Sequence, residues 1–112
     1  MTLNDICRAS GATVVCGETD RECSGVYVGD LLSRAMSHVQ SGDLWITIMS
    51  NINVVAVASL TEPAAVLLAE DVELQPDALQ GAKDNGITVL SSPLSAYEIC
   101  AAVHAIAQGA DR

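Results

Sequence analysis

The chain has 112 residues, 50% of them hydrophobic, with 14 acidic and five basic residues and a formal net charge of −9. Its length suits one domain with a core of its own, while the few scattered bases exclude the basic surface that DNA or RNA binding needs. No apolar run is long enough to cross a membrane, and Met1 is followed by TLNDICRASG rather than by a basic and apolar leader, so we expect a cytoplasmic protein.

The amino-terminal part predicts one helix and two strands. Thr2 suits the N-cap of a helix that Gly11 ends. Thr13–Cys16 favours a short strand, Gly17–Glu22 is polar and typical of a turn, and Cys23–Val28 has the alternating pattern of a second strand. We therefore predict a small hairpin in which these two strands are neighbours.

The next unit is a helix followed by a buried strand. Asp30 suits the N-cap of a helix over Leu31–Val39, whose apolar residues recur at helical spacing. Leu44–Met49, LWITIM, is apolar and partly β-branched, which predicts an interior strand with Trp45 as its anchor. Ser50 then begins a turn.

The segment Asn53–Leu60 is almost wholly apolar. Its β-branched residues favour a strand, but a crossover helix is required if the strands before and after it are parallel neighbours. We predict the helix. Because a helix that is hydrophobic almost all round must be covered on more than one side, we expect the leftover face to bind a second copy of the chain, giving a homodimer. The interface residues predicted on this ground are Val54, Val55, Val57 and Ala58.

The best-specified stretch is Ala64–Ser92, which predicts a strand, a helix and a strand. Ala64–Ala69 is a continuous apolar run, as expected of a strand covered on both faces, and Ile87–Leu90 is a second β-favouring run. Between them, Pro76 suits a first helical turn and Gly86 a left-handed stop. A crossover of this length implies parallel strands joined right-handedly.

A last helix is predicted over residues 95–108. The repeated order of strand, helix and strand, with no low-complexity linker, predicts the fold class: α/β, a single small domain over residues 1–112, with a mostly parallel sheet and flanking helices.

A candidate ligand site follows from this topology, because ligands of open parallel sheets bind at the carboxyl ends of the strands. Such a site could hold a small polar ligand, or a divalent cation on Glu70 and Asp71, since hard cations favour carboxylates. The alternative is a solvated acidic loop without a ligand, because carboxylates with no nearby Lys or Arg repel phosphate. A nucleotide could bind here only if a metal ion bridged it to the carboxylates. The candidate ligand-binding residues are Ser50, Asn51, Glu70, Asp71, Ser91 and Ser92.

The four cysteines and two histidines form no recognisable metal or catalytic motif. No two cysteines make a CxxC pair, so buried thiols are expected, with a redox or metal role for Cys16 and Cys23 as the alternative. His38 and His104 fall in helical patterns with no nucleophile or carboxylate beside them in sequence. We therefore predict no catalytic residue, no metal site and no cofactor.

Four segments resemble the DRTGG domain family, small modules similar to the amino-terminal domain of HPr kinase/phosphorylase: LNDICRASG, CSGVYVGDLLSRAM, LWITIMSN and AAVLLAEDVELQPDALQGAKDNGITVLSS. The resemblance covers roughly residues 3–106. In that family a Gly-Asp-Arg stretch follows the strand that here ends at Met49, and a Thr-Gly-Gly turn follows the strand that here ends at Ala69. This chain has Ser50-Asn51-Ile52-Asn53 and Glu70-Asp71-Val72 at these places, so only the scaffold is carried over.

The resemblance implies a fold like the HPr kinase amino-terminal domain and a non-catalytic, dimerising or regulatory module. Some relatives lie within nucleotide-regulated pyrophosphatases, and free-standing ones resemble accessory proteins of iron hydrogenase and electron-transfer systems, which implies a possible protein partner. Serine kinase activity is not expected, because the chain has no GxxxxGK[ST] phosphate loop. The leading hypothesis is a homodimeric regulatory or accessory module. The alternative is a sensor of a small ligand or adenine nucleotide at the carboxyl-end loops.

Overall fold

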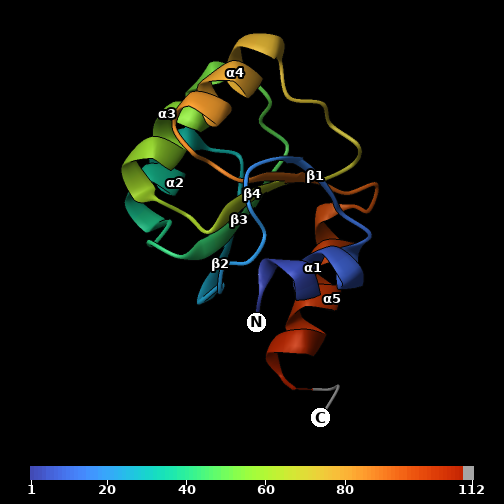
Figure 1. The fold of residues 1–112 in the computed structure, drawn as a ribbon. Coiled ribbons are helices and arrows are strands. Elements are labelled where there is room, and N and C mark those ends of the chain that lie inside the picture. Colours follow the sequence, from blue (N-terminus) through green and yellow to red (C-terminus); the bar gives the residue numbers. More distant parts are fainter. Residues whose placement is uncertain (110–112) are drawn as a thin grey trace.

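The structure, a computed structural model, describes residues 1–109; the end of the predicted domain, residues 110–112, lies outside this description. Helices and strands alternate along most of the described chain (Figure 1). In chain order the elements are α1 Leu3–Ser10, β1 Thr13–Cys16, β2 Gly25–Val28, α2 Leu32–His38, β3 Asp43–Thr47, α3 Ile52–Thr61, β4 Ala65–Leu68, α4 Pro76–Asp84, β5 Val89–Ser91 and α5 Ala96–Ala107.

The strands form one five-stranded sheet in the order β1-β5-β4-β3-β2. Strands β2 to β5 are parallel to one another, and β1 runs antiparallel to β5, with Thr13 opposite Ser91. This arrangement confirms the predicted α/β class and the mostly parallel sheet. It also confirms the parallel strand, helix and strand of the stretch Ala64–Ser92.

The predicted hairpin between β1 and β2 is wrong, because the two strands lie at opposite edges of the sheet. The segment between them crosses one end of the sheet instead of turning back. The hydroxyl of Thr88 donates a hydrogen bond to the carbonyl oxygen of Glu18 at 2.8 Å. The backbone N–H of Cys23 donates one to the carbonyl oxygen of Met1 at 2.7 Å. As a result β1 covers the edge of β5, and β2 extends the parallel part of the sheet beside β3.

Helices cover both faces of the sheet, with α2, α3 and α4 on one face and α1 and α5 on the other (Figure 1). Since alternate residues of a strand point to opposite faces, Trp45 of β3 packs in the α2–α3–α4 layer, while Leu44 and Ile46 pack under α1 and α5. Trp45 has no exposed surface, and its indole N–H donates to the carbonyl oxygen of Gly29 at 3.0 Å. Its predicted role as an anchor is confirmed.

The apolar segment after Asn51 is helical, as predicted, and forms α3. The residues predicted as an interface, Val54, Val55, Val57 and Ala58, are however 2%, 5%, 4% and 2% exposed. They are buried because α3 lies in the middle of its layer, packed against α2, α4 and the sheet. These four side chains belong to the core of the chain itself, so they are not free to form an interface with a second copy.

Side-chain caps set the ends of several helices. The hydroxyl of Thr2 accepts a hydrogen bond from the backbone of Asp5, whose carboxylate accepts one from the backbone of Thr2. Hydrogen bonding from Thr2 to this carboxylate, chiefly from the backbone N–H, holds the pKa of Asp5 below its usual value. Gly11, at φ 67°, ends α1 as predicted. Asp30 is not the N-cap of α2, because the first helical N–H groups donate to the carbonyl oxygen of Leu31.

The burial pattern predicts the response of two leucines to the same substitution. Leu67→Ala should lower the free energy of unfolding by about 2–5 kcal/mol, because it leaves a cavity where the wild-type side chain has no exposed surface. Leu60→Ala, at a side chain that is 71% exposed, should change it by less than about 0.5 kcal/mol. Urea unfolding followed by the fluorescence of Trp45 measures both, and equal losses would contradict the pattern.

Candidate functional site

The loops at the carboxyl ends of the parallel strands are joined by backbone hydrogen bonds. The N–H of Gln75 donates to the carbonyl oxygen of Ser50 at 2.9 Å, and that of Asp71 donates to the carbonyl oxygen of Ser92 at 3.0 Å. A third bond, from the N–H of Glu70 to the carbonyl oxygen of Leu94, measures 2.9 Å. The structure therefore brings together the loops on which the candidate residues were predicted.

Glu70 and Asp71 form a left-handed turn directly after β4. Their φ angles are 60° and 57°, and the N–H of Val72 closes the turn onto the carbonyl oxygen of Ala69 at 3.2 Å. Non-glycine residues rarely adopt this conformation, and each pays roughly 1–2 kcal/mol to do so. Both side chains are exposed. The acidic pair is thus held in a turn for which glycine is the ordinary residue.

The polar groups of two other candidate residues are used for structure. The hydroxyl of Ser92 is fully buried, donates to the carbonyl oxygen of Ser10 at 2.6 Å and accepts from the N–H of Leu94. Asn51 is the N-cap of α3, and its side-chain oxygen accepts from the N–H of Asn53 at 3.0 Å. Ser92 and Asn51 therefore stabilise the loops, and a ligand would have to meet the remaining candidates.

A cavity of about 200 Å³, which we call the strand-end cavity, opens at the carboxyl ends of β2, β3 and β4. Of the six candidate residues only Glu70 lines it. The carboxylate of Asp30, beyond the end of β2, is a second acidic group there. No Lys or Arg is among its lining residues in the described part of the chain, which are Val28, Gly29, Asp30, Ile46, Thr47, Ile48, Glu70 and Ala96.

Sequence reasoning missed Asp30 because the predicted hairpin placed β2 beside β1. The signal was present: a Gly-Asp break follows a β-favouring segment, and in a parallel sheet such a break lies at the same edge as Glu70. Assigning β2 to the parallel part of the sheet would have added Asp30 to the candidates.

An exposed apolar surface lies beside the strand-end cavity, where β2 meets the outer side of α5. A groove of about 420 Å³ runs along it, and no acidic side chain is among its described lining residues. Val26 is 41% exposed and Tyr97 is 82% exposed, because α1 and α5 cover the sheet only as far as β3. We call this surface the β2–α5 face and define it by Val26, Val28, Ile48, Tyr97, Cys100 and Ala101.

The cysteines and histidines show no arrangement for metal or redox chemistry. All four cysteines are free thiols, and burial raises the pKa of Cys16 and Cys23, which disfavours the reactive thiolate. The ring of His38 stacks on Tyr27, with 6.1 Å between ring centroids. Among residues 1–109, no three His, Cys, Asp or Glu side chains lie close enough together to hold a metal ion.

In the same range, no helix combines the length and apolar character that crossing a bilayer requires.

Comparison with known proteins identifies a family and a related fold. A family model described as the DRTGG domain matches residues 5–106. The chain is also similar, with a TM-score of 0.72 and 14% identity, to the crystal structure of the CBS and DRTGG domains of the regulatory region of Clostridium perfringens pyrophosphatase, complexed with its activator diadenosine tetraphosphate. That match covers 91% of this chain and 45% of the other, so this chain spans less than half of that structure. No curated protein matches the chain.

The left-handed turn predicts a stability gain on substitution by glycine. Glu70→Gly should raise the free energy of unfolding by up to about 1 kcal/mol, because glycine adopts a positive φ without steric cost. Glu73→Gly, which removes the same side chain from the same loop at a residue without a positive φ, should lower it by a few tenths of a kcal/mol, roughly the entropic cost of glycine. Urea unfolding compares the two. A loss of stability in Glu70→Gly as large as that in Glu73→Gly would refute the strained turn.

Proposed function

The chain belongs to the DRTGG domain family, and we propose that it is a non-catalytic regulatory module that acts as a homodimer. Family membership supports the regulatory part of this proposal, since the related fold belongs to a pyrophosphatase region that is described as regulatory. The sequence contains no phosphate loop of the GxxxxGK[ST] type, which supports a role without phosphoryl transfer.

The observation that carries the homodimer is the β2–α5 face. It presents exposed apolar side chains from a sheet edge and a helix, and monomeric proteins seldom leave such side chains grouped together. Within residues 1–109, strand β2, which contributes Val26 and Val28 to this face, pairs with another strand on one side only, namely β3.

The distribution of charge permits a second copy of the chain as the partner on this face. Two chains that each carry a net charge of −9 repel one another over most of their surfaces. The groove has no acidic lining residue within the described chain, so two copies can make their closest contact along it without pairing acidic groove residues, while Asp30 and Glu70 of the neighbouring strand-end cavity lie outside the groove. A two-fold axis through this face would bury it on both copies at once.

Two matched valine substitutions test the homodimer. Val26→Glu places a charge on the β2–α5 face, which a symmetric interface would bury twice, so the dissociation constant should rise about 100-fold or more. Val14→Glu makes the same change at a valine that is 50% exposed on β1, at the opposite edge of the sheet, and should leave the dimer intact. Analytical ultracentrifugation at micromolar concentration measures both. A wild-type chain that sediments as a monomer would reject the proposal.

A second candidate function is binding of an adenine nucleotide at the strand-end cavity. The related structure holds diadenosine tetraphosphate, and the cavity lies at the sheet edge where ligands of parallel sheets bind. The carboxylates of Asp30 and Glu70 oppose a bare phosphate, so binding here would need a bridging divalent cation.

Thermal-shift measurements with diadenosine tetraphosphate, with and without Mg²⁺, test this second function. Binding to the folded state should raise the melting temperature only when Mg²⁺ is present. Asp30→Asn should reduce the shift, whereas Asp84→Asn, on the exposed end of α4, should not. No shift at millimolar nucleotide with Mg²⁺ would count against a nucleotide site.

A further inference from the structure

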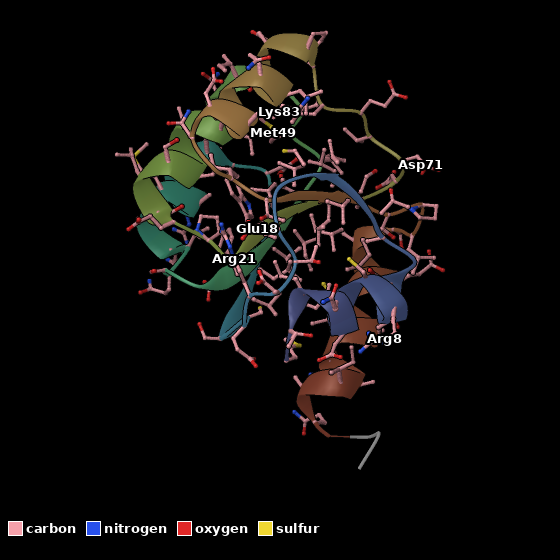
Figure 2. The ribbon with its side chains drawn as sticks, viewed as in Figure 1. Arg8, Glu18, Arg21, Met49, Asp71 and Lys83 are labelled. Carbon is pink, nitrogen blue, oxygen red and sulfur yellow. The ribbon has the colours of Figure 1, made fainter. Side chains whose placement is uncertain are left out.

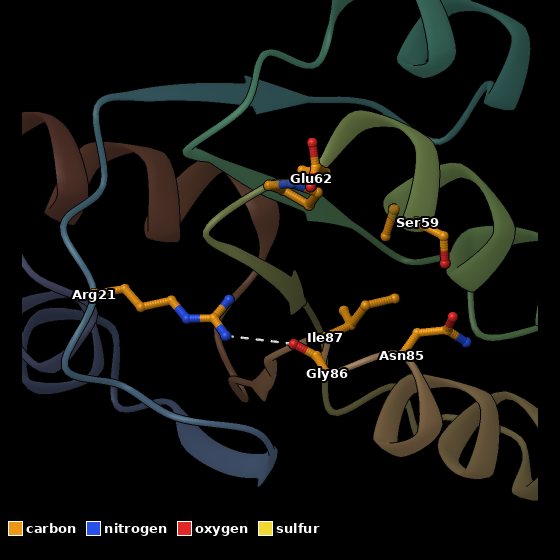
Figure 3. Close-up of a pocket in the computed structure, with 8 residues that line it drawn as sticks. Arg21, Ser59, Glu62, Asn85, Gly86 and Ile87 are labelled. Atoms are coloured by element: carbon orange, nitrogen blue, oxygen red, sulfur yellow. Dashed lines mark hydrogen bonds between the residues drawn. The ribbon is translucent and has the colours of Figure 1, made fainter.

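A second cavity, of about 300 Å³, opens at the other end of the sheet, where β4 and β5 begin (Figure 3). Three parts of the chain converge on it: the segment before β2 with Arg21, the end of α3 with Ser59 and Glu62, and the α4–β5 connection with Asn85. Arg21 lies well away from Asp71 of the strand-end loops in the view of Figure 2. The cavity is therefore separate from the strand-end cavity.

Arg21 gives this cavity a positively charged wall. Its guanidinium donates to the carbonyl oxygen of Gly86 at 3.4 Å, a long bond that leaves its other N–H donors available (Figure 3). The ion pairs within residues 1–109 are those of Met1 with Glu22 and of Arg8 with Asp5, so no described carboxylate neutralises Arg21. A guanidinium in this position is suited to bind a carboxylate through two parallel hydrogen bonds.

Glu62 supplies a negative charge to this cavity, although both its backbone conformation and its position at the end of α3 are unfavourable for a glutamate. It is the C-cap of α3 in the left-handed conformation, with φ 56°, where glycine or asparagine is the common residue. Its carboxylate also lies at the negative end of the helix dipole. A residue that opposes both the local backbone and the local electrostatics, and that lines a cavity, points to a role in binding.

Three apolar side chains, which we call the apolar floor, line the cavity together with polar side chains that have spare acceptors. Ala58, Pro63 and Ile87 are buried and line it. The hydroxyl of Ser59 donates to a carbonyl of its own helix, and the amide nitrogen of Asn85 donates to one in α4, which leaves the side-chain oxygens of both residues as acceptors.

We propose that this cavity binds an α-amino acid with a small aliphatic side chain. Arg21 pairs with the carboxylate of the ligand, Glu62 with its ammonium group, and the apolar floor receives its side chain. Net charge favours such a ligand over a phosphate or a dicarboxylate, because a zwitterion carries no net charge and is not repelled by a chain of −9, whereas those anions are.

Three probes test the chemistry of recognition by NMR titration of the ¹⁵N-labelled chain: L-leucine, L-leucinamide, which lacks the carboxylate, and N-acetyl-L-leucine, which lacks the ammonium group. L-leucine should cause saturable shifts of the backbone amides of Arg21, Ser59, Glu62, Asn85 and Gly86. Each blocked analogue should bind about tenfold or more weakly, since each removes one charged pair. The proposal is overturned by an absence of saturable shifts with L-leucine, by equal binding of the analogues, or by shifts centred on Glu70 and Asp71.

Matched variants test the residues. Glu62→Gly should weaken L-leucine binding about tenfold or more while raising the melting temperature, because glycine relieves the positive φ. Glu70→Gly makes the same change in the same backbone conformation at the other end of the sheet and should leave binding unchanged. Arg21→Gln should also weaken binding about tenfold or more, whereas Arg34→Gln on α2 should leave it unchanged. Unchanged binding in folded Glu62→Gly or Arg21→Gln would refute the assignment.

Discussion

Burial of the central strand β4 on both faces is the constraint on which the rest of the structure depends. Val66 and Leu68 point into the α2–α3–α4 layer, and Ala65 and Leu67 point under α1 and α5. A strand covered on both sides requires two helical layers, and parallel neighbours on both edges require crossover helices. The loops that leave β4 and its neighbours therefore gather at one end of the sheet, and the loops that enter them gather at the other.

Local sequence patterns correctly predicted those features of the fold that neighbouring residues determine. The caps of α1, the crossover around α4 and the helical state of α3 follow from neighbouring residues and from chain connectivity, and the structure confirms them. The pairing of β1 does not follow from them, because it depends on a partner, β5, that lies far along the chain. The same limit explains the misplaced interface: an apolar helix has the same sequence pattern whether α2 and α4 or a second copy covers it.

The two ends of the sheet share one feature that no periodic pattern reveals. Within residues 1–109, the non-glycine residues at positive φ are Glu62, Glu70 and Asp71, all of them acidic and all at turns that begin or end next to β4. Glu62 and Arg21, which makes no ion pair within these residues, line one cavity, and Glu70 lines another that has no Lys or Arg among its described lining residues. Under the two proposals the ends would therefore bind different ligands, a zwitterion at the first and a metal-bridged anion at the second.

The β2–α5 face is the surface on which a regulatory role would depend, because assembly there would bring two strand-end cavities close to the same interface. Intermolecular NOEs in a mixed sample of isotope-labelled and unlabelled chain test this claim most directly. The account predicts contacts between copies that involve Val26, Tyr97 and Ala101. Intermolecular contacts confined to other surfaces would contradict it. So would the absence of contacts at these residues at a concentration where sedimentation shows that the chain is a dimer.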